Sequence, residues 1–457
     1  MSRPSVPAAQ TDPATLSPDV AGSEAATRVR YRVLAFLAVM TFVLYLDRVC
    51  IAQARESISG DLGLTDEQMG YVFAAFTIAY GLFEIPTGRL GDRFGSRRVL
   101  TRIVVWWSLF TALTGAAFGF VNLLVVRFLF GAGEAGGLPN AARVIERWFP
   151  ISSRGAAHGV ITTAMMIGGG LAPMTAAWLI WLVGWRWSFV FLAAIGCAWA
   201  AAFALWFRET PAEHPHVNDA ERRLIDADRS AAEVLARGTH EAVPWRAIFR
   251  SPTAWVLAAL ISCAAAVVYV FTYWFPAYLA SRELDSRYAG FLASMVLLGG
   301  AAGCACGGVI TDRITGYFGD RRAGYRLIGC AAYALATGAL LVALMVESPL
   351  LASIFFALSC FAIHVQVPAW WGSVTVISGR HTGVVFGLLN SMGVPAAAAS
   401  QIVPGTLASR WKAEGFSDRA VWDLMFAGYV PILIAGFVLW MFVNPNRSAV
   451  GESDSTG

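Results

Sequence analysis

The sequence predicts an all-α membrane protein with twelve transmembrane helices in two pseudo-symmetric halves of six. The chain has 457 residues, of which 57% are hydrophobic and only 14% are charged, whereas about 25% are charged in a typical soluble domain. Its apolar residues fall in runs of about 18–25, the length that a helix needs to cross a bilayer. A long polar stretch separates the sixth run from the seventh, and a short charged motif that begins at Gly88 begins again at Gly308.

Each predicted span is an apolar run bounded by polar or glycine-containing loops. In chain order the spans cover residues 32–54, 68–90, 98–117, 119–142, 156–181, 186–207, 253–280, 288–311, 325–346, 349–375, 382–407 and 421–443. The first six form a predicted N-terminal bundle, 32–207, and the last six a C-terminal bundle, 253–443. The charged stretch 208–252 is then a linker between the bundles.

The two ends of the chain, 1–31 and 444–457, are rich in small and polar residues and lack an apolar core. This composition predicts disordered tails, and the first of them does not have the pattern of a signal peptide. Loops with many arginines follow the second, fourth and eighth spans, for example "GDRFGSRR" and "RVIERWFPISSRG", whereas the loop after the first span is more acidic. The positive-inside rule therefore places both termini and the linker in the cytoplasm.

Several classes of function do not fit these residues. The net charge of +4 and the lack of a basic tract with aromatic residues argue against a nucleic-acid partner. The seven cysteines lie inside apolar runs without a CxxC pair, so no metal site is expected. The sequence offers no nucleophile–base pair, so the protein is not expected to be an enzyme.

The repeated charged motif resembles the loop signature of the major facilitator superfamily. "GRLGDRFGSRR" carries the whole signature, and "GVITDRITGYFGDRR" repeats its core. Glycine lets two helix ends approach closely, and an Asp–Arg pair can latch them in one conformation. The predicted latch consists of Gly88, Asp92, Arg93, Arg97, Gly308, Asp312 and Arg313.

Within that superfamily three stretches resemble the anion:cation symporters, which include bacterial galactonate and hexuronate transporters. They are "YLDRV", "RFLFGAGEAGGLPN" and "RWFPISSRGAAHG", and the resemblance extends over about residues 32–443. It implies uptake of a small organic anion with protons, driven by the proton gradient without a cofactor. It further implies a multi-pass protein of the bacterial inner membrane, surrounded by lipid and expected to be a monomer.

Four charged residues lie inside the predicted spans. A central charge costs about 2.5–3.5 kcal/mol on insertion scales, so such residues usually face a polar cavity. Arg127 and Glu134 are seven residues apart and share one helical face, while the adjacent Asp47 and Arg48 point about 100° apart. The resemblance implies that Asp47 and Glu134 carry the proton, that Arg48 contacts the substrate carboxylate and that Arg127 changes partners. A purely structural ion network is the alternative.

The second half has no comparable charge, so it is expected to shape the substrate site. Together with Arg48 and Arg127, the candidate substrate-binding residues are Tyr45, Tyr80, Tyr273, Trp371, Ser373 and Asn390. Helix packing or a membrane-interface position is the alternative for each aromatic residue. Met165 stands where several sugar-acid symporters have a glutamine, which favours an acid with fewer hydroxyls or an aromatic one. The roles of Glu84 and His364 stay open.

Three other functions fit the same fold. A proton-coupled exporter would use the same carboxylates in the opposite direction. An organic anion exchanger normally has a basic substrate-facing residue in each half, and the second half lacks a central arginine. A receptor that binds without transport would not need Asp47 and Glu134.

Overall fold

The computed structural model describes residues 25–226 and 245–444, and every regular element in these ranges is helical. Residues 1–24, 227–244 and 445–457 lie outside this description. Most of the two predicted tails and the middle of the predicted linker therefore fall outside it as well.

The first half contains six spans. They are formed by α1 (Val29–Leu62), α2 (Asp66–Phe94), α3 (Ser96–Gly115), the pair α4 (Phe120–Glu134) and α5 (Gly137–Trp148), and α6 (Ile151–Trp206). The 56 residues of α6 hold two spans, which meet at a kink where Gly184 adopts φ 77°. This kink coincides with the loop predicted between 181 and 186.

The second half contains the other six spans. They are α10 (Pro252–Ala280), α11 (Ser286–Phe318), α12 (Arg321–Met345), and the pairs α13 (Pro349–Val365) with α14 (Val367–Ser378), α15 (Thr382–Ser391) with α16 (Gly393–Ala413), and α17 (Asp418–Ala427) with α18 (Val430–Phe442). Short helices η1 (Pro211–Glu213), α7 (Asp219–Asp226), α9 (Trp245–Arg250) and η2 (Gly379–His381) lie outside the spans.

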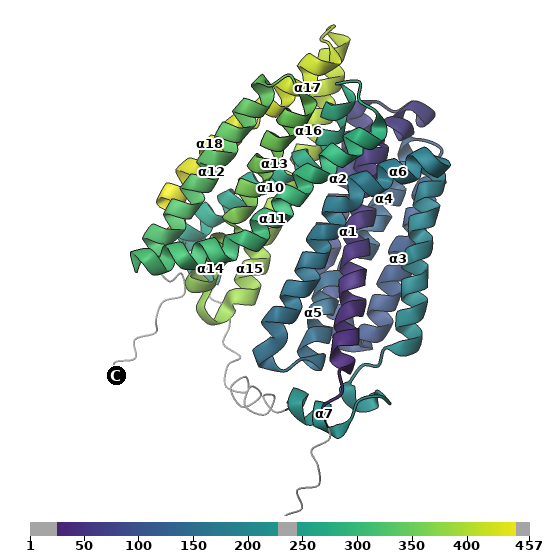
Figure 1. The fold of residues 1–457 in the computed structure, drawn as a ribbon, viewed down its shortest axis with the longest axis vertical. Helices are drawn as coiled ribbons and strands as arrows, with labels where there is room; N and C mark the ends of the chain where they lie inside the picture. The colour runs from purple at the N-terminus through teal and green to yellow at the C-terminus, as the bar shows by residue number, and fades with distance from the viewer. Residues whose placement is uncertain (1–24, 227–244, 445–457) are drawn as a thin grey trace, which may run out of the picture.

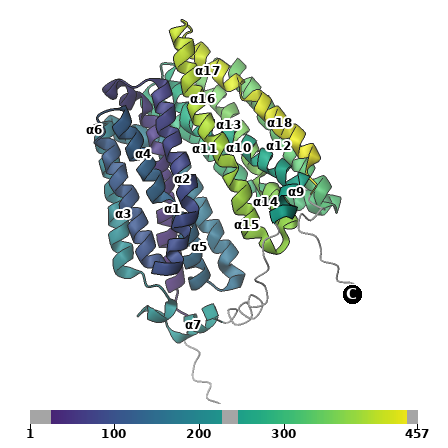
Figure 2. The ribbon, with the colours of Figure 1, turned by 180° about the vertical axis from the view of Figure 1, so that it is seen from behind.

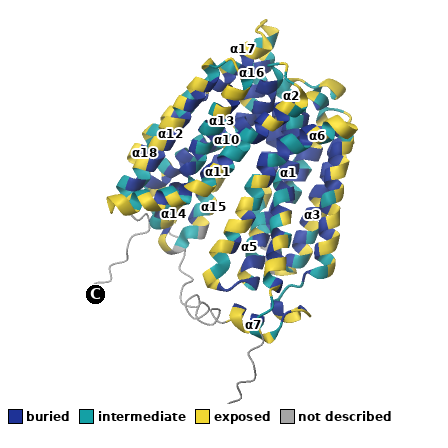
Figure 3. Ribbon diagram, viewed as in Figure 1, coloured by how far each residue is buried: buried dark blue, intermediate teal, exposed yellow. Residues whose placement is uncertain are grey.

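Length and apolarity support the membrane assignment. In the described part of the chain, eight helical segments are long and apolar enough to cross a membrane, and one of these is the double span α6. The spans α2, α3 and α15–α16 fall below that threshold of length or apolarity and complete the twelve. Figure 3 shows many exposed residues along the outward faces of α3, α12 and α18, where lipid would cover them.

The helices of the two halves form two bundles, which Figures 1 and 2 show from opposite sides. The main contacts between the bundles are those of α2 with α16 and of α6 with α11. We call the end of the molecule with η1 and α7 the linker end, and the other the far end. In both views the bundles diverge toward the linker end.

Close packing and an ion pair join the halves at the far end. A Cβ atom on Gly70 would lie 2.7 Å from the carbonyl oxygen of Gln401, so only glycine permits this approach. Asp66, near the start of α2, pairs with Arg55 at 2.5 Å and with Lys412 of the other half at 2.9 Å. These contacts hold together the ends of α2 and α16 that lie farthest from the linker.

A buried carboxylate ties the linker to the first half. Glu221 on α7 is 0% exposed and accepts hydrogen bonds from the Thr27 hydroxyl at 2.6 Å and from the backbone N–H of Val29 at 3.1 Å. It also accepts from the backbone N–H of Arg30 at 3.2 Å and from the guanidinium of Arg30 at 3.1 Å. The carboxylate thus caps the N-terminus of α1, where the helix dipole favours negative charge. We call this arrangement the linker cap.

A buried histidine next to the linker cap packs against the ends of α5 and α6. His214 is 1% exposed and its ring lies edge-on to Trp148, at 5.8 Å, and to Trp206, at 4.7 Å between ring centroids. Burial lowers the pKa of His214 below its usual value, so the ring is neutral at pH 7. A neutral ring suits this aromatic surrounding.

Replacing Glu221 with glutamine is expected to destabilise the protein by about 2 kcal/mol, because hydrogen bonds to a charged group are lost and the Arg30 guanidinium keeps no buried counter-ion. The thermal unfolding midpoint of the purified protein measures this loss. Asp219→Asn is the matched control on the same helix, since its pair with Arg222 is exposed and such pairs contribute about 0–1 kcal/mol. Equal midpoints for the two variants would contradict a capping role.

The predicted latch is placed only in part. Gly88 packs near Pro139, where an added Cβ would lie 3.5 Å from the proline Cβ. The Nε of Arg97 donates to the Ala204 carbonyl at 3.0 Å. Arg93, Asp312 and Arg313 are exposed, Gly308 has open space around it, and the side chain of Asp92 is not described. For the described residues the structure shows no ion pair within the latch, whose role stays a prediction.

Candidate functional site

The centre of the site is an ion pair between α1 and α4. The Nε of Arg48 donates to Glu134 Oε1 at 2.9 Å, and its Nη2 donates to the same oxygen. Arg48 is 7% exposed and Glu134 is 0% exposed. The pairing means that Glu134 faces Arg48, so in this state the guanidinium expected to hold the substrate is held by the protein.

The glycines around Glu134 explain how an acid comes to lie there. Gly131 packs against the carbonyl of Phe76, and a Cβ on Gly136 would lie 2.5 Å from the Thr87 hydroxyl. Gly136 also has φ 84°, a conformation that side-chain-bearing residues rarely adopt. These residues end α4 at Glu134 and bring it against α2, whereas the sequence predicts one uninterrupted span over 119–142.

Aromatic rings surround the guanidinium of Arg48. Its Cζ lies 4.5 Å from the ring centroid of Tyr45, 4.6 Å from that of Tyr80 and 4.9 Å from that of Phe76. Rings at this distance attract a cation electrostatically while leaving its N–H donors available. Arg48 is therefore stabilised even when Glu134 releases it.

Arg127 and Asp47 lie beside this pair and are each 1% exposed. The Cζ of Arg127 stacks 4.3 Å from the ring centroid of Phe130. Its Nε and Nη2, and both carboxylate oxygens of Asp47, have no hydrogen-bond partner among the described residues. Buried polar groups without partners are costly, so these two residues are suited to change their bonds during a functional cycle.

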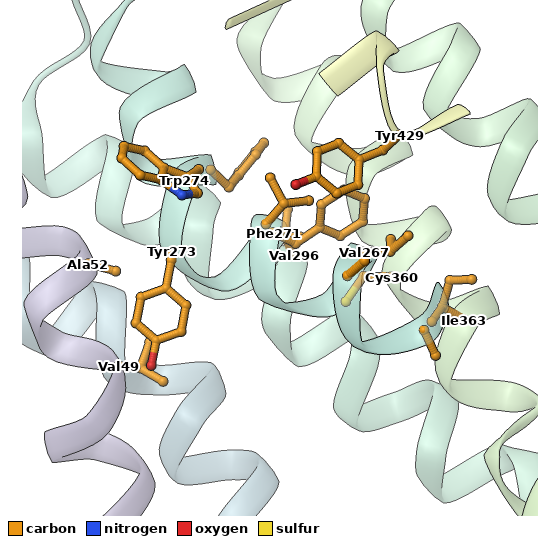
Figure 4. Packing of buried hydrophobic residues seen from close by; sticks show 14 of the residues in the cluster. Val49, Ala52, Val267, Phe271, Tyr273, Trp274, Val296, Cys360, Ile363 and Tyr429 are labelled. Carbon is orange, nitrogen blue, oxygen red and sulfur yellow. The ribbon is translucent and has the colours of Figure 1, made fainter. Parts of the chain in front are cut away.

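Two adjoining cavities lie between the halves next to this charged group. The first, of about 140 Å³, is lined by Tyr45, Arg48, Tyr273 and the other residues that α1, α6, α10, α11 and α13 contribute. The second, of about 240 Å³, is lined by Tyr80, Glu84 and residues of α10, α13, α15 and α16. Figure 4 shows Tyr273 reaching from α10 toward Val49 of α1, across the boundary between the halves.

The predicted substrate residues are therefore distributed unevenly. Tyr45, Arg48 and Tyr273 line the first cavity, and Tyr80 and Asn390 line the second. Arg127 lies behind the cavity wall and does not line either cavity.

The structure does not bring Trp371 and Ser373 to these cavities. Trp371 is 54% exposed and packs on Phe386, with 4.6 Å between ring centroids, and the buried Ser373 donates to the Ala369 carbonyl. The reason is local. The predicted span 349–375 breaks at Gln366 and a new helix starts, so helical spacing counted from the first part does not give the face of the second.

Sequence reasoning did not assign Tyr269 and His364, which line both cavities. Tyr269 lies one helical turn from Tyr273, and this spacing was the available signal. On α6 it is Met166, and not the neighbouring Met165, that lines the first cavity. In the described part of the chain no three His, Cys, Asp or Glu side chains gather as metal ligands would.

Comparison with known proteins places this geometry in a family. The sequence profile of the Major Facilitator Superfamily matches residues 37–401. The chain is similar to a probable sulfoacetate transporter of Cupriavidus necator, with 30% identity over 443 residues that cover 94% of this chain and 97% of that protein. It is also similar to the hexuronate transporter of Bacillus subtilis, with 28% identity over 368 residues that cover 78% of this chain and 83% of that protein.

Solved structures share the fold. A bacterial homolog of the human lysosomal transporter Spinster, in an inward-facing and unoccupied conformation, matches with a TM-score of 0.75 and 20% identity, over 92% of this chain and 98% of that one. A D-xylose–proton symporter matches with a TM-score of 0.70 and 14% identity, over the same shares of the two chains. At these identities the likeness concerns the fold alone.

Proposed function

Because the chain belongs to the Major Facilitator Superfamily, a family of membrane transporters and not of enzymes, we propose that it takes up a small organic anion together with protons. The observation that carries this proposal is the buried Arg48–Glu134 pair at the wall of the cavity between the halves. One residue of the pair can bind a carboxylate, and the other can bind a proton.

The pair couples the two events through competition for one guanidinium. While Glu134 is ionised it holds Arg48, which leaves little attraction for a substrate anion. A proton on Glu134 removes that charge and frees the guanidinium to form charge-assisted hydrogen bonds with the substrate carboxylate. Asp47 is the second proton site in this scheme, and Arg127 shifts between the two carboxylates as their charges change.

Rocking of the two halves about this midplane site then exposes it to either side of the membrane. We place both termini and the linker end in the cytoplasm of a bacterium, and the chain as a monomer in the inner membrane. With that orientation the described state is the one whose halves diverge toward the cytoplasm. The proton gradient, and no cofactor, drives uptake.

The substrate is proposed to be a small carboxylate. The relatives above are named for sulfoacetate and hexuronate, both of which are acids that Arg48 could hold. The lining of the first cavity is largely apolar, with Val49, Met166 and Leu297 among its members. This lining favours an acid with fewer hydroxyls than a sugar acid.

Proton entry into proteoliposomes tests the proposal. With a pH dye inside, we expect acidification when one member of a panel of sulfoacetate, sugar acids, hydroxy acids and aromatic acids is added outside. The signal should be absent from protein-free liposomes. Exchange of labelled acid without any pH change would instead identify an anion exchanger, and acidification on efflux alone would contradict uptake.

A further inference from the structure

His364 on α13 is the basic residue that the second half contributes to the site. It lines both cavities and is half-buried. It faces the first cavity together with Arg48 of the first half, and the scheme above does not use it. A cavity with one basic group from each half differs from the one predicted, in which the second half supplies shape only.

The backbone fixes which ring nitrogen of His364 remains available to a ligand. Nδ1 lies 2.8 Å from the carbonyl oxygen of Cys360. A carbonyl oxygen only accepts, so Nδ1 carries the hydrogen and donates it. In the neutral ring Nε2 is then a hydrogen-bond acceptor, and within the described residues it has no protein partner.

Packing holds the ring in this orientation. A Cβ on Gly300 of α11 would lie 2.9 Å from both Cε1 and Nδ1 of His364. The absence of a side chain at Gly300 therefore makes the space that the ring occupies. An imidazole that is held by a hydrogen bond and by packing against a glycine can accept a hydrogen bond from a ligand without reorienting.

The group that complements Nε2 must donate a hydrogen bond. An ammonium group is disfavoured because Arg48 already brings a positive charge to the same cavity. A hydroxyl is neutral and donates. The first cavity, of about 140 Å³, has a volume that suits a short acid. Its other hydroxyls are that of Thr272, which already donates to the Val268 carbonyl, and those of Tyr45, Tyr269 and Tyr273.

We propose that His364 is a substrate-binding residue, whose Nε2 accepts a hydrogen bond from a hydroxyl of the acid that Arg48 holds. The substrate class is then a short hydroxy acid, bound at its carboxylate by the first half and at its hydroxyl by the second. The inference rests on the proposed function in one respect, that Arg48 binds the carboxylate. Because the acid would then contact both halves, the closing of the two halves around the site would depend on its hydroxyl.

Calorimetric binding to the purified protein tests this inference without any proton gradient. The probes are pairs of acids that differ by one hydroxyl: propionate against lactate and 3-hydroxypropionate, and butyrate against 3-hydroxybutyrate. One hydrogen bond corresponds to a preference of about threefold to tenfold for a hydroxy acid. In His364→Phe, which keeps a ring without an acceptor, we expect the ratio to fall to about one while the parent acid binds as before.

Two further variants separate recognition from structure. Gly300→Ala displaces the ring and should lower the same ratio although the histidine is present. His158→Phe, at a histidine of α6 outside both cavities, should leave it unchanged. An unchanged ratio in His364→Phe, or an equal loss for both members of a pair, would overturn the proposal.

The experiments distinguish a failure of the symport proposal from a failure of the proposed role of His364. Acidification by an acid without a hydroxyl, with no binding of the hydroxy acids, would overturn the role of His364 and leave symport intact. A hydroxyl preference that disappears in His364→Phe, without any proton movement in liposomes, would support the role of His364 and contradict symport.

Discussion

Replacing Glu134 with glutamine will abolish proton-driven accumulation of substrate and leave substrate exchange close to the native rate. The amide oxygen of glutamine still accepts a hydrogen bond from Arg48, but it carries no titratable proton. One pH unit corresponds to about 1.36 kcal/mol per proton, so each coupled proton concentrates the substrate up to about tenfold per pH unit. The variant should reach a ratio of about one.

Uptake of labelled acid into proteoliposomes at a fixed pH gradient measures the accumulation ratio. Exchange of labelled acid outside for unlabelled acid inside, without a pH gradient, measures the rate of substrate exchange. Glu134→Asp keeps a titratable group and should retain part of the accumulation. If a folded Glu134→Gln protein loses both activities, the Arg48–Glu134 pair is a structural ion network and not the coupling site.

Replacing Arg48 with alanine will remove most of the substrate affinity and, with it, transport. Truncating one member of a buried, hydrogen-bonded charge pair typically costs about 2–5 kcal/mol, which is roughly 30-fold to 4,000-fold in a dissociation constant. Arg48→Lys keeps the charge but loses the planar fork that binds a carboxylate through two hydrogen bonds. It should fall between the native protein and Arg48→Ala in a direct binding measurement.

The loss of substrate affinity must be separated from destabilisation of the folded protein, because Arg48→Ala also leaves the Glu134 carboxylate buried without its partner. Removing both partners is far less destabilising than removing one. The double variant Arg48→Ala/Glu134→Gln should therefore regain thermal stability without regaining binding. Native affinity in Arg48→Ala would contradict the assignment of the substrate carboxylate to this residue.

The spans themselves could be predicted because each depends on a local property, the length of an apolar run. The breaks inside them could not. The second half of the chain interrupts its spans at Gln366 and Met392. A proline follows each break, Pro368 and Pro395, but Pro276 and Pro404 lie inside helices that continue, so a proline does not by itself mark a break. Such a break resets the helical phase, and for this reason helical spacing did not give the face of Trp371 and Ser373, which do not line the two cavities.

The composition of the site was also predictable, since charges inside apolar runs are rare and conspicuous. The choice of partners was not. Arg48 and Glu134 are 86 residues apart, and only the arrangement of α1 and α4 within the first bundle decides that Glu134 meets Arg48 while Arg127 stacks on Phe130. His364 carried too weak a signal to be assigned, because the carbonyl and the glycine that orient it come from backbone geometry.

The linker cap has a consequence for the order in which the chain can fold. The carboxylate of Glu221 and the Val29 N–H that it accepts from are 192 residues apart, so during synthesis the first turn of α1 waits for a group made after the sixth span. Apolar runs alone would end the first half at 207, whereas α7, the last described helix before residue 227, still contacts the start of α1. A nascent chain cut at 207 would insert its six spans with the start of α1 frayed, and one cut at 226 would not.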